Sequence, residues 1–137
     1  MVPLVGAKQV WSNTLGAAAV QGSGITVAGN RVAVASGNGT LAVVDASTGA
    51  DVWRASTGAR LVTGAGFDGH MAAVVTERNE LVAAVSGQTV WRIRLPSAAY
   101  TAPLVAGQRV FVLSADRTVT AFDGNTGARL WSQGRTG

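Results

Sequence analysis

Few residues of this 137-residue chain have the types and spacing that binding or catalytic chemistry requires. The stretch Gly64–Gly69 matches the G-x-G-x-x-G pattern of dinucleotide-binding turns. In such turns the phosphates bind at the N-terminus of the helix that follows. Here the strand-like segment from His70 to Thr76 follows instead. We therefore interpret the match as coincidental.

The residue types in the sequence give little support to metal binding or nucleophilic catalysis. Asp123 to Gly127 begins like a calcium-binding loop, but Gly134 stands where the bidentate glutamate would be required. His70 is the single histidine, so a histidine-based metal site and a catalytic triad lack residues. The chain contains no cysteine, which excludes a disulfide, a thiolate metal site and a thiol nucleophile. The sequence predicts no catalytic, metal-binding or cofactor-binding residue.

The charge of the chain does not point to a nucleic-acid partner. The formal net charge is +4, and the 11 basic residues are scattered without forming a block. Hydrophobic residues make up 47% and charged residues 13%, enough apolar material for a core. No apolar run reaches the roughly 18 residues of a transmembrane helix.

Four tryptophans, Trp11, Trp53, Trp91 and Trp131, mark a repeat of roughly 40 residues. Two of them end the same motif, in which Asp, Thr-Gly and Trp have identical spacing. It comprises Asp45, Thr48, Gly49 and Trp53 in one copy and Asp123, Thr126, Gly127 and Trp131 in another. A middle copy keeps Gly87 and Trp91 but has a shorter turn without the Asp and the Thr.

Each repeat unit divides into four short apolar segments separated by turn residues, which predicts four antiparallel strands. The first strand of the second unit is expected at Leu61–Val62. Four-stranded units with this period are typical of β-propeller blades. We predict an all-β, single-domain partial β-propeller over residues 1–137, with blades at about 17–54, 55–95 and 96–133 and a leading strand at 8–14.

The motif residues have a structural interpretation in this fold. Asp and Thr side chains accept hydrogen bonds from nearby amides, glycine adopts a positive φ, and the tryptophan packs against the next blade. We expect Trp131→Ala to cost about 3–5 kcal/mol if the site is buried. The predicted blade-docking residues are Asp45, Thr48, Gly49, Trp53, Trp91, Asp123, Thr126, Gly127 and Trp131.

The motif Ala-x-Asp-x-x-Thr-Gly-x-x-x-Trp at Ala121–Trp131 resembles the repeat of the PQQ-type, or quinoprotein-like, propellers. The copy at Val43–Trp53 differs only in its first residue. Within this group, Gln9–Gly16 and Ala102–Val112 resemble the BamB-type lipoproteins of outer-membrane protein assembly. The absence of a Trp-Asp pair distinguishes the chain from WD40 repeats.

The resemblance implies a non-catalytic scaffold at the periplasmic face of the outer membrane. Its implied partners are a BamA-type barrel-assembly protein and unfolded outer-membrane precursors. Propellers have about four to eight blades, so three blades are expected to be the N-terminal part of an implied eight-bladed ring. The family's signal peptide and lipid-bearing cysteine are absent here, and its partner-binding loop would follow Trp131, so no partner-binding residue is assigned.

Two alternatives share the repeat. One is part of a PQQ-dependent quinoprotein dehydrogenase, a class that resembles this repeat but uses a catalytic aspartate and calcium ligands. The other is a periplasmic propeller that binds a different protein partner. In either case the open sheet edges of three blades predict self-association of the chain.

Overall fold

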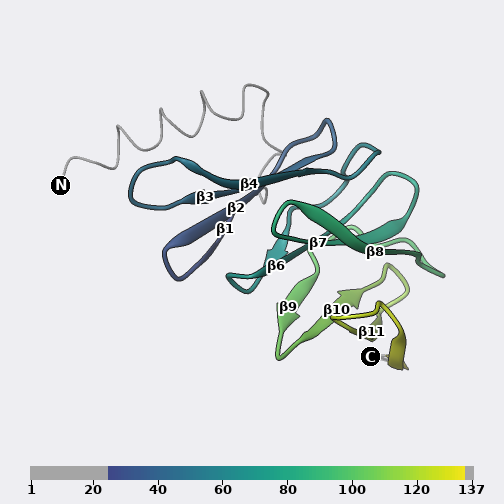
Figure 1. Ribbon diagram of the computed structural model, residues 1–137. Helices are drawn as coiled ribbons and strands as arrows, with labels where there is room; N and C mark the ends of the chain where they lie inside the picture. Colours follow the sequence, from purple (N-terminus) through teal and green to yellow (C-terminus); the bar gives the residue numbers. More distant parts are fainter. Residues whose placement is uncertain (1–24, 135–137) are drawn as a thin grey trace.

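The chain folds into three four-stranded antiparallel sheets, each formed by strands that follow one another in sequence (Figure 1). The computed structural model describes residues 25–134. The first sheet contains β1 (Ile25–Ala28), β2 (Arg31–Ala35), β3 (Thr40–Asp45) and β4 (Asp51–Ser56). The second contains β5 (Gly66–Phe67), β6 (Met71–Val75), β7 (Glu80–Val85) and β8 (Gln88–Arg94). The third contains β9 (Leu104–Ala106), β10 (Arg109–Leu113), β11 (Thr118–Asp123) and β12 (Arg129–Gly134).

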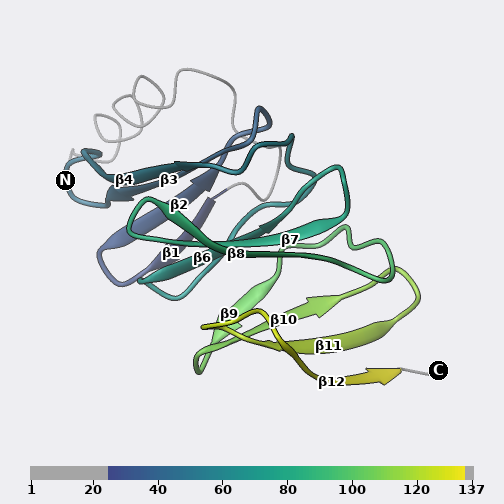
Figure 2. The same ribbon diagram turned by 45° about the vertical axis from the view of Figure 1, so that its right-hand side comes forward.

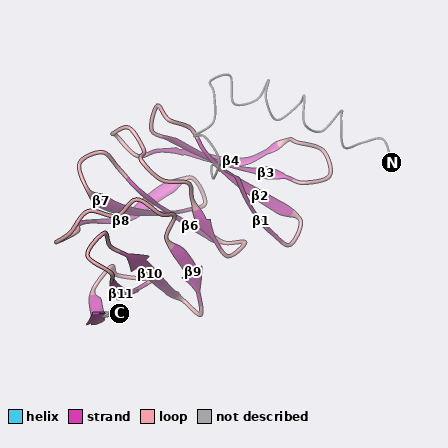
Figure 3. Ribbon diagram, turned by 180° about the vertical axis from the view of Figure 1, so that it is seen from behind, coloured by secondary structure: helices cyan, strands magenta, loops and turns pink. Residues whose placement is uncertain are grey.

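The predicted all-β architecture of three four-stranded antiparallel units is confirmed. The described residues form strands and loops without helices (Figure 3). Accordingly, residues 25–134 contain no helix with the length and hydropathy to cross a membrane. The predicted leading strand at residues 8–14, with Trp11, lies outside the described residues.

The two middle strands of the first and second sheets are apolar along most of their length because both of their faces are covered. In the second sheet, β6 is buried throughout and β7 is buried between its first and last residues. The fourth strands, by contrast, are largely exposed, and every residue of β12 is exposed. These strands are therefore the outer edges of the sheets.

The sheets lie beside one another in chain order (Figure 2). One apolar core fills the space between the first two sheets, with Leu41 on one side and Val74 on the other. A second core between the next two sheets includes Leu81 and Val110. The first strands contact one another from sheet to sheet, β1 with β5 and β5 with β9, and β4 contacts β8. The blades of a β-propeller are arranged in this way, with the first strand of each blade beside the first strand of the next.

The prediction of the first strand of the second sheet at Leu61–Val62 is wrong. Leu61 forms only an isolated bridge with Thr76, and the strand itself is Gly66–Phe67. Glycine is disfavoured in strands, but it permits close backbone approach. A Cβ on Gly66 would overlap the carbonyl oxygen of Pro103 in the segment leading to the third sheet. Tertiary packing therefore selects a segment of low strand propensity.

One end of all three sheets, which we call the crossover end, carries the segments that lead from each sheet to the next. The β2–β3, β6–β7 and β10–β11 turns lie at the same end. Their backbones are joined to these segments: the Thr57 amide donates to the Gly39 carbonyl at 2.9 Å, and the Glu77 amide donates to the Arg60 carbonyl at 2.7 Å. The β1–β2 and β3–β4 turns and their counterparts lie at the opposite end.

Candidate functional site: the joints between sheets

Two turns at the opposite end use their acidic side chains to hold the backbone. Asp45 Oδ1 accepts hydrogen bonds from the amides of Ser47 at 2.8 Å and Thr48 at 3.2 Å. Thr48 Oγ1 in turn accepts from the Ala50 amide at 3.1 Å. Gly49 completes the turn with a φ of 76°, in the left-handed region that favours glycine.

The third sheet repeats this geometry. Asp123 Oδ1 accepts from the amides of Asn125 at 2.7 Å and Thr126 at 3.3 Å. Thr126 Oγ1 accepts from the Ala128 amide at 3.2 Å, and Gly127 has a φ of 79°. One oxygen of each motif aspartate is thus hydrogen-bonded to two backbone amides of its own turn.

Trp91 forms the most complete joint between two sheets. Its side chain extends from β8 of the second sheet to the β11–β12 turn of the third sheet and is buried, with 9% exposed. Indole Nε1 donates to the carbonyl oxygen of Gly124 at 2.7 Å. The ring lies against Gly127, where a Cβ would be 2.7 Å from ring carbons Cδ2 and Cε3. Gly127 therefore allows both the positive φ of the turn and the close packing of the indole ring.

Trp53 contacts a different kind of turn in the second sheet. The β7–β8 turn is short, and both Ser86 and Gly87 have positive φ, at 52° and 85°, as a two-residue hairpin requires. A Cβ on Gly87 would lie 3.6 Å from Cβ of Trp53. Trp53 is half-buried and packs on the core between the first two sheets.

Trp131 differs from Trp91 because no described sheet covers the face on which it lies. It is 46% exposed, and its ring contacts Phe111 with a centroid separation of 6.2 Å. The pairing register places Leu104, Phe111, Ala121 and Trp131 in one row across the third sheet. The loss of about 3–5 kcal/mol expected for Trp131→Ala required a buried side chain. Because Trp131 is exposed and Trp91 is buried, this loss is expected for Trp91→Ala instead.

The Asp123 turn supports a stability prediction. Asp123→Ala should lower the free energy of unfolding by about 1–2 kcal/mol because two amides lose their acceptor. Asp123→Asn is the matched control, since its side-chain oxygen can still accept both hydrogen bonds. Urea unfolding followed by circular dichroism measures the difference. Equal losses in the two variants would show that the amide hydrogen bonds are not the cause.

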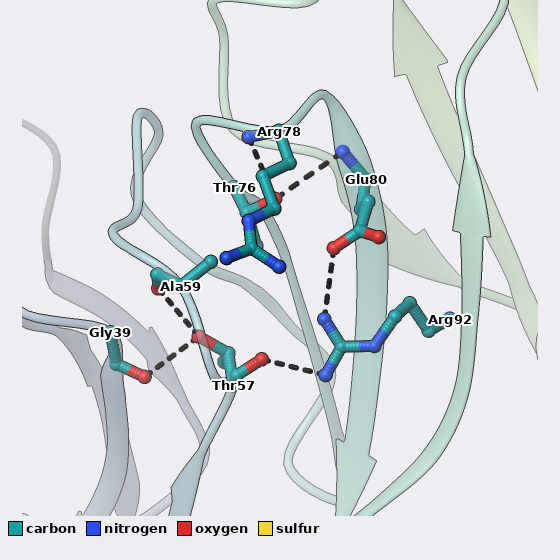
Figure 4. A network of polar contacts seen from close by, with 7 residues as sticks. All are labelled: Gly39, Thr57, Ala59, Thr76, Arg78, Glu80 and Arg92. Atoms are coloured by element: carbon teal, nitrogen blue, oxygen red, sulfur yellow. Dashed lines mark hydrogen bonds and ion pairs between the residues drawn. The ribbon is translucent and has the colours of Figure 1, made fainter.

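A polar network joins the first and second sheets at the crossover end (Figure 4). Thr57 is fully buried, and its Oγ1 donates to the carbonyl oxygens of Gly39 at 2.8 Å and Ala59 at 3.0 Å, sharing its one proton between them. The Thr57 carbonyl accepts from Arg92 Nη2 at 2.6 Å. Arg92 Nη1 also pairs with Glu80 at 2.9 Å. The guanidinium of Arg92 thereby ties β8 to the segment that leaves the first sheet.

Three residues that make contacts between the sheets could not be recognised from the sequence repeat. Gly124 supplies the carbonyl that Trp91 binds, yet alanine stands at the matching position in the Asp45 turn. Gly66 and Arg92 act through residues distant in sequence. Their roles are visible only after the sheets are placed beside one another.

The residues that first suggested chemistry are in ordinary positions. Gly66 and Phe67 form β5, so the G-x-G-x-x-G segment contains a strand and no helix follows it. His70 is exposed, and its amide donates to Asp68 Oδ1 at 2.9 Å. Over residues 25–134, histidine, aspartate and glutamate side chains form no group of three or more that could hold a metal ion.

Comparison with known proteins identifies relatives over most of the chain. The family described as outer membrane protein assembly factor BamB matches residues 5–64 and 40–137. BamB of Bordetella pertussis is 32% identical over 136 residues, which cover 98% of this chain and 35% of that protein. The chain spans about a third of the length of the curated relatives it matches.

Solved structures share the fold. BamB from Moraxella catarrhalis superposes with a TM-score of 0.72 at 23% identity, covering 82% of this chain and 35% of that chain. A europium-containing methanol dehydrogenase superposes with a TM-score of 0.62 at 21% identity, covering 80% and 24%. These likenesses show that the three sheets are β-propeller blades.

Proposed function

The chain belongs to the outer membrane protein assembly factor BamB family, and on that basis we propose that it is a non-catalytic propeller segment of a scaffold for outer-membrane protein assembly. The family match over nearly the whole chain carries this proposal. The proposed location is the periplasmic face of the outer membrane. The proposed partners are a BamA-type barrel-assembly protein and unfolded outer-membrane precursors.

We also propose that the three sheets are consecutive blades of a larger ring, with blade boundaries near 17–54, 55–95 and 96–133. The pattern of joints supports this. The faces of the first two sheets that point toward the next sheet are buried in the two cores. The corresponding face of the third sheet, which we call the forward face, exposes Leu104, Leu113 and Trp131.

The dehydrogenase alternative rests on the shared fold alone, since the methanol dehydrogenase is 21% identical. Asp45 and Asp123 each have an oxygen hydrogen-bonded to two turn amides. Such acids have a structural role that explains their presence without catalysis. A binding function therefore explains the motif residues more directly than a redox function does.

Isothermal titration calorimetry of the full-length protein against soluble periplasmic domains of the BamA-type protein from the same genome tests the proposal. We expect saturable binding and no dye reduction when PQQ, calcium and alcohols are added. Absence of binding together with PQQ-dependent dye reduction would replace the scaffold assignment with the dehydrogenase.

Self-association is the predicted behaviour of the chain on its own. On the forward face Leu104 is 61% and Leu113 is 47% exposed, and apolar surface of this kind favours association. Light scattering across a concentration series should show a mass above 13.9 kDa that rises with concentration. Leu113→Glu should reduce the association, whereas Val62→Glu, on a crossover segment, should not. A concentration-independent monomer would contradict the prediction.

A further inference from the structure

The crossover end carries four exposed arginines with no ion pair or side-chain hydrogen bond to the residues that the structure describes. They come from two crossover-end turns, from the last residue of β8 and from the first crossover segment. Side chains that are free of partners keep their full capacity to bind an anionic group. These residues are Arg60, Arg78, Arg94 and Arg117.

The fold brings these arginines to one end from separate segments. The Arg60 carbonyl accepts the amide of Glu77 at 2.7 Å, so Arg60 lies beside the turn that contains Arg78. Arg94 pairs in register with Glu80 at the base of the same turn. Figure 4 shows the guanidinium groups of Arg78 and Arg92 both directed toward the crossover segment at Thr57 and Ala59.

Three carboxylates at the crossover end, of Glu77, Glu80 and Asp116, offset this charge only in part, because five arginines lie there when Arg92 is included. The Glu80 carboxylate is paired with Arg92 at 2.9 Å. Asp116 accepts hydrogen bonds from the Thr118 amide and from Ser97 Oγ, both at 3.1 Å. Hydrogen bonding to Thr118, and to a smaller extent to Ser97, lowers the pKa of Asp116 from its ordinary value.

The opposite end of the molecule carries a formal charge of −1. Arg31, Arg109 and Arg129 lie there together with four carboxylates, of Asp45, Asp51, Asp68 and Asp123. The two ends therefore differ in electrostatic potential, and the crossover end is the positive one. A positive surface speeds encounter with an acidic partner and orients it.

We propose that the crossover end is a binding surface for an acidic segment of a partner protein. Two exposed apolar residues, Val62 at 43% and Tyr100 at 71%, lie on the two crossover segments. Tyrosine and arginine together are typical of protein–protein interfaces. Glu77 and Asp116 interrupt the positive surface, which disfavours a continuous polyanion such as nucleic acid.

This inference goes beyond the proposed scaffold role, because it assigns a surface and a partner chemistry that do not depend on which assembly the protein joins. The surface lies at an end of the sheets, so it stays accessible when further blades cover the forward face. The proposal therefore applies both to this chain alone and to a longer protein.

Fluorescence anisotropy with a fluorescein-labelled peptide of alternating glutamate and glycine tests the proposal at low ionic strength. The double variant Arg60→Glu with Arg78→Glu should bind the peptide about tenfold or more weakly. The matched control, Arg109→Glu with Arg129→Glu, makes the same charge change at the opposite end and should bind within about twofold of the parent. Circular dichroism confirms that all three proteins fold.

Three outcomes would overturn the proposal. The parent chain fails to bind the acidic peptide, or both double variants lose affinity to the same extent, which would indicate net charge alone. The third is tighter binding of single-stranded DNA than of the peptide, which would assign the surface to a nucleic acid. Tighter binding of the acidic peptide than of an alternating lysine–glycine peptide supports the proposal.

Discussion

Replacing Trp91 with alanine should lower the free energy of unfolding by about 3–5 kcal/mol, the range measured for large aromatic residues in protein cores. The indole is 9% exposed and packs in the core between the second and third sheets. Its loss also leaves the Gly124 carbonyl without the donor that lies 2.7 Å away. Both effects weaken the same joint. Urea unfolding followed by circular dichroism, at one fixed protein concentration, measures the change.

Trp131→Ala is the matched control, because Trp131 occupies the same repeat position but is 46% exposed. Its replacement should cost well under half of the loss seen for Trp91→Ala, since much less apolar area is removed from contact. The comparison separates docking between sheets from the general effect of removing a tryptophan. Similar unfolding midpoints and slopes for Trp91→Ala and the parent would contradict a docking role for Trp91.

The sequence was informative wherever a few neighbouring residues determine the structure. The Asp-x-x-Thr-Gly turns form through hydrogen bonds between residues two or three positions apart, such as Asp45 Oδ1 with the amides of Ser47 and Thr48. Apolar runs such as β7 are interrupted by turn residues on both sides. These local signals were enough to predict three four-stranded units.

Features that depend on packing between sheets could not be predicted from the sequence. Gly66 lies in a glycine-rich stretch typical of a turn, yet it pairs with Ala73 to form β5, and the Pro103 carbonyl approaches it closely. Trp131 has the same motif as Trp53, but its exposure depends on what covers the forward face. Arg92 reaches Thr57 across 35 positions of sequence, a contact that no local pattern signals.

Gly127→Ala is expected to destabilise the joint from the opposite side of the Trp91 contact. Gly127 has a φ of 79°, and an alanine in the left-handed region costs about 1–2 kcal/mol. The added methyl would lie 2.7 Å from two indole carbons, and such overpacking costs about 1–3 kcal/mol more. Urea unfolding should therefore show a loss larger than backbone strain alone can produce.

Gly107→Ala isolates the backbone contribution, because Gly107 has a φ of 59° and a Cβ there would meet nothing within 4 Å. Its cost should match only the first part of the Gly127→Ala loss. A double-mutant cycle then tests the contact itself, since in the Trp91→Ala background the methyl has no indole to displace. There the cost of Gly127→Ala should fall to that of Gly107→Ala. If it stays unchanged, the strain lies in the turn and the indole does not depend on Gly127.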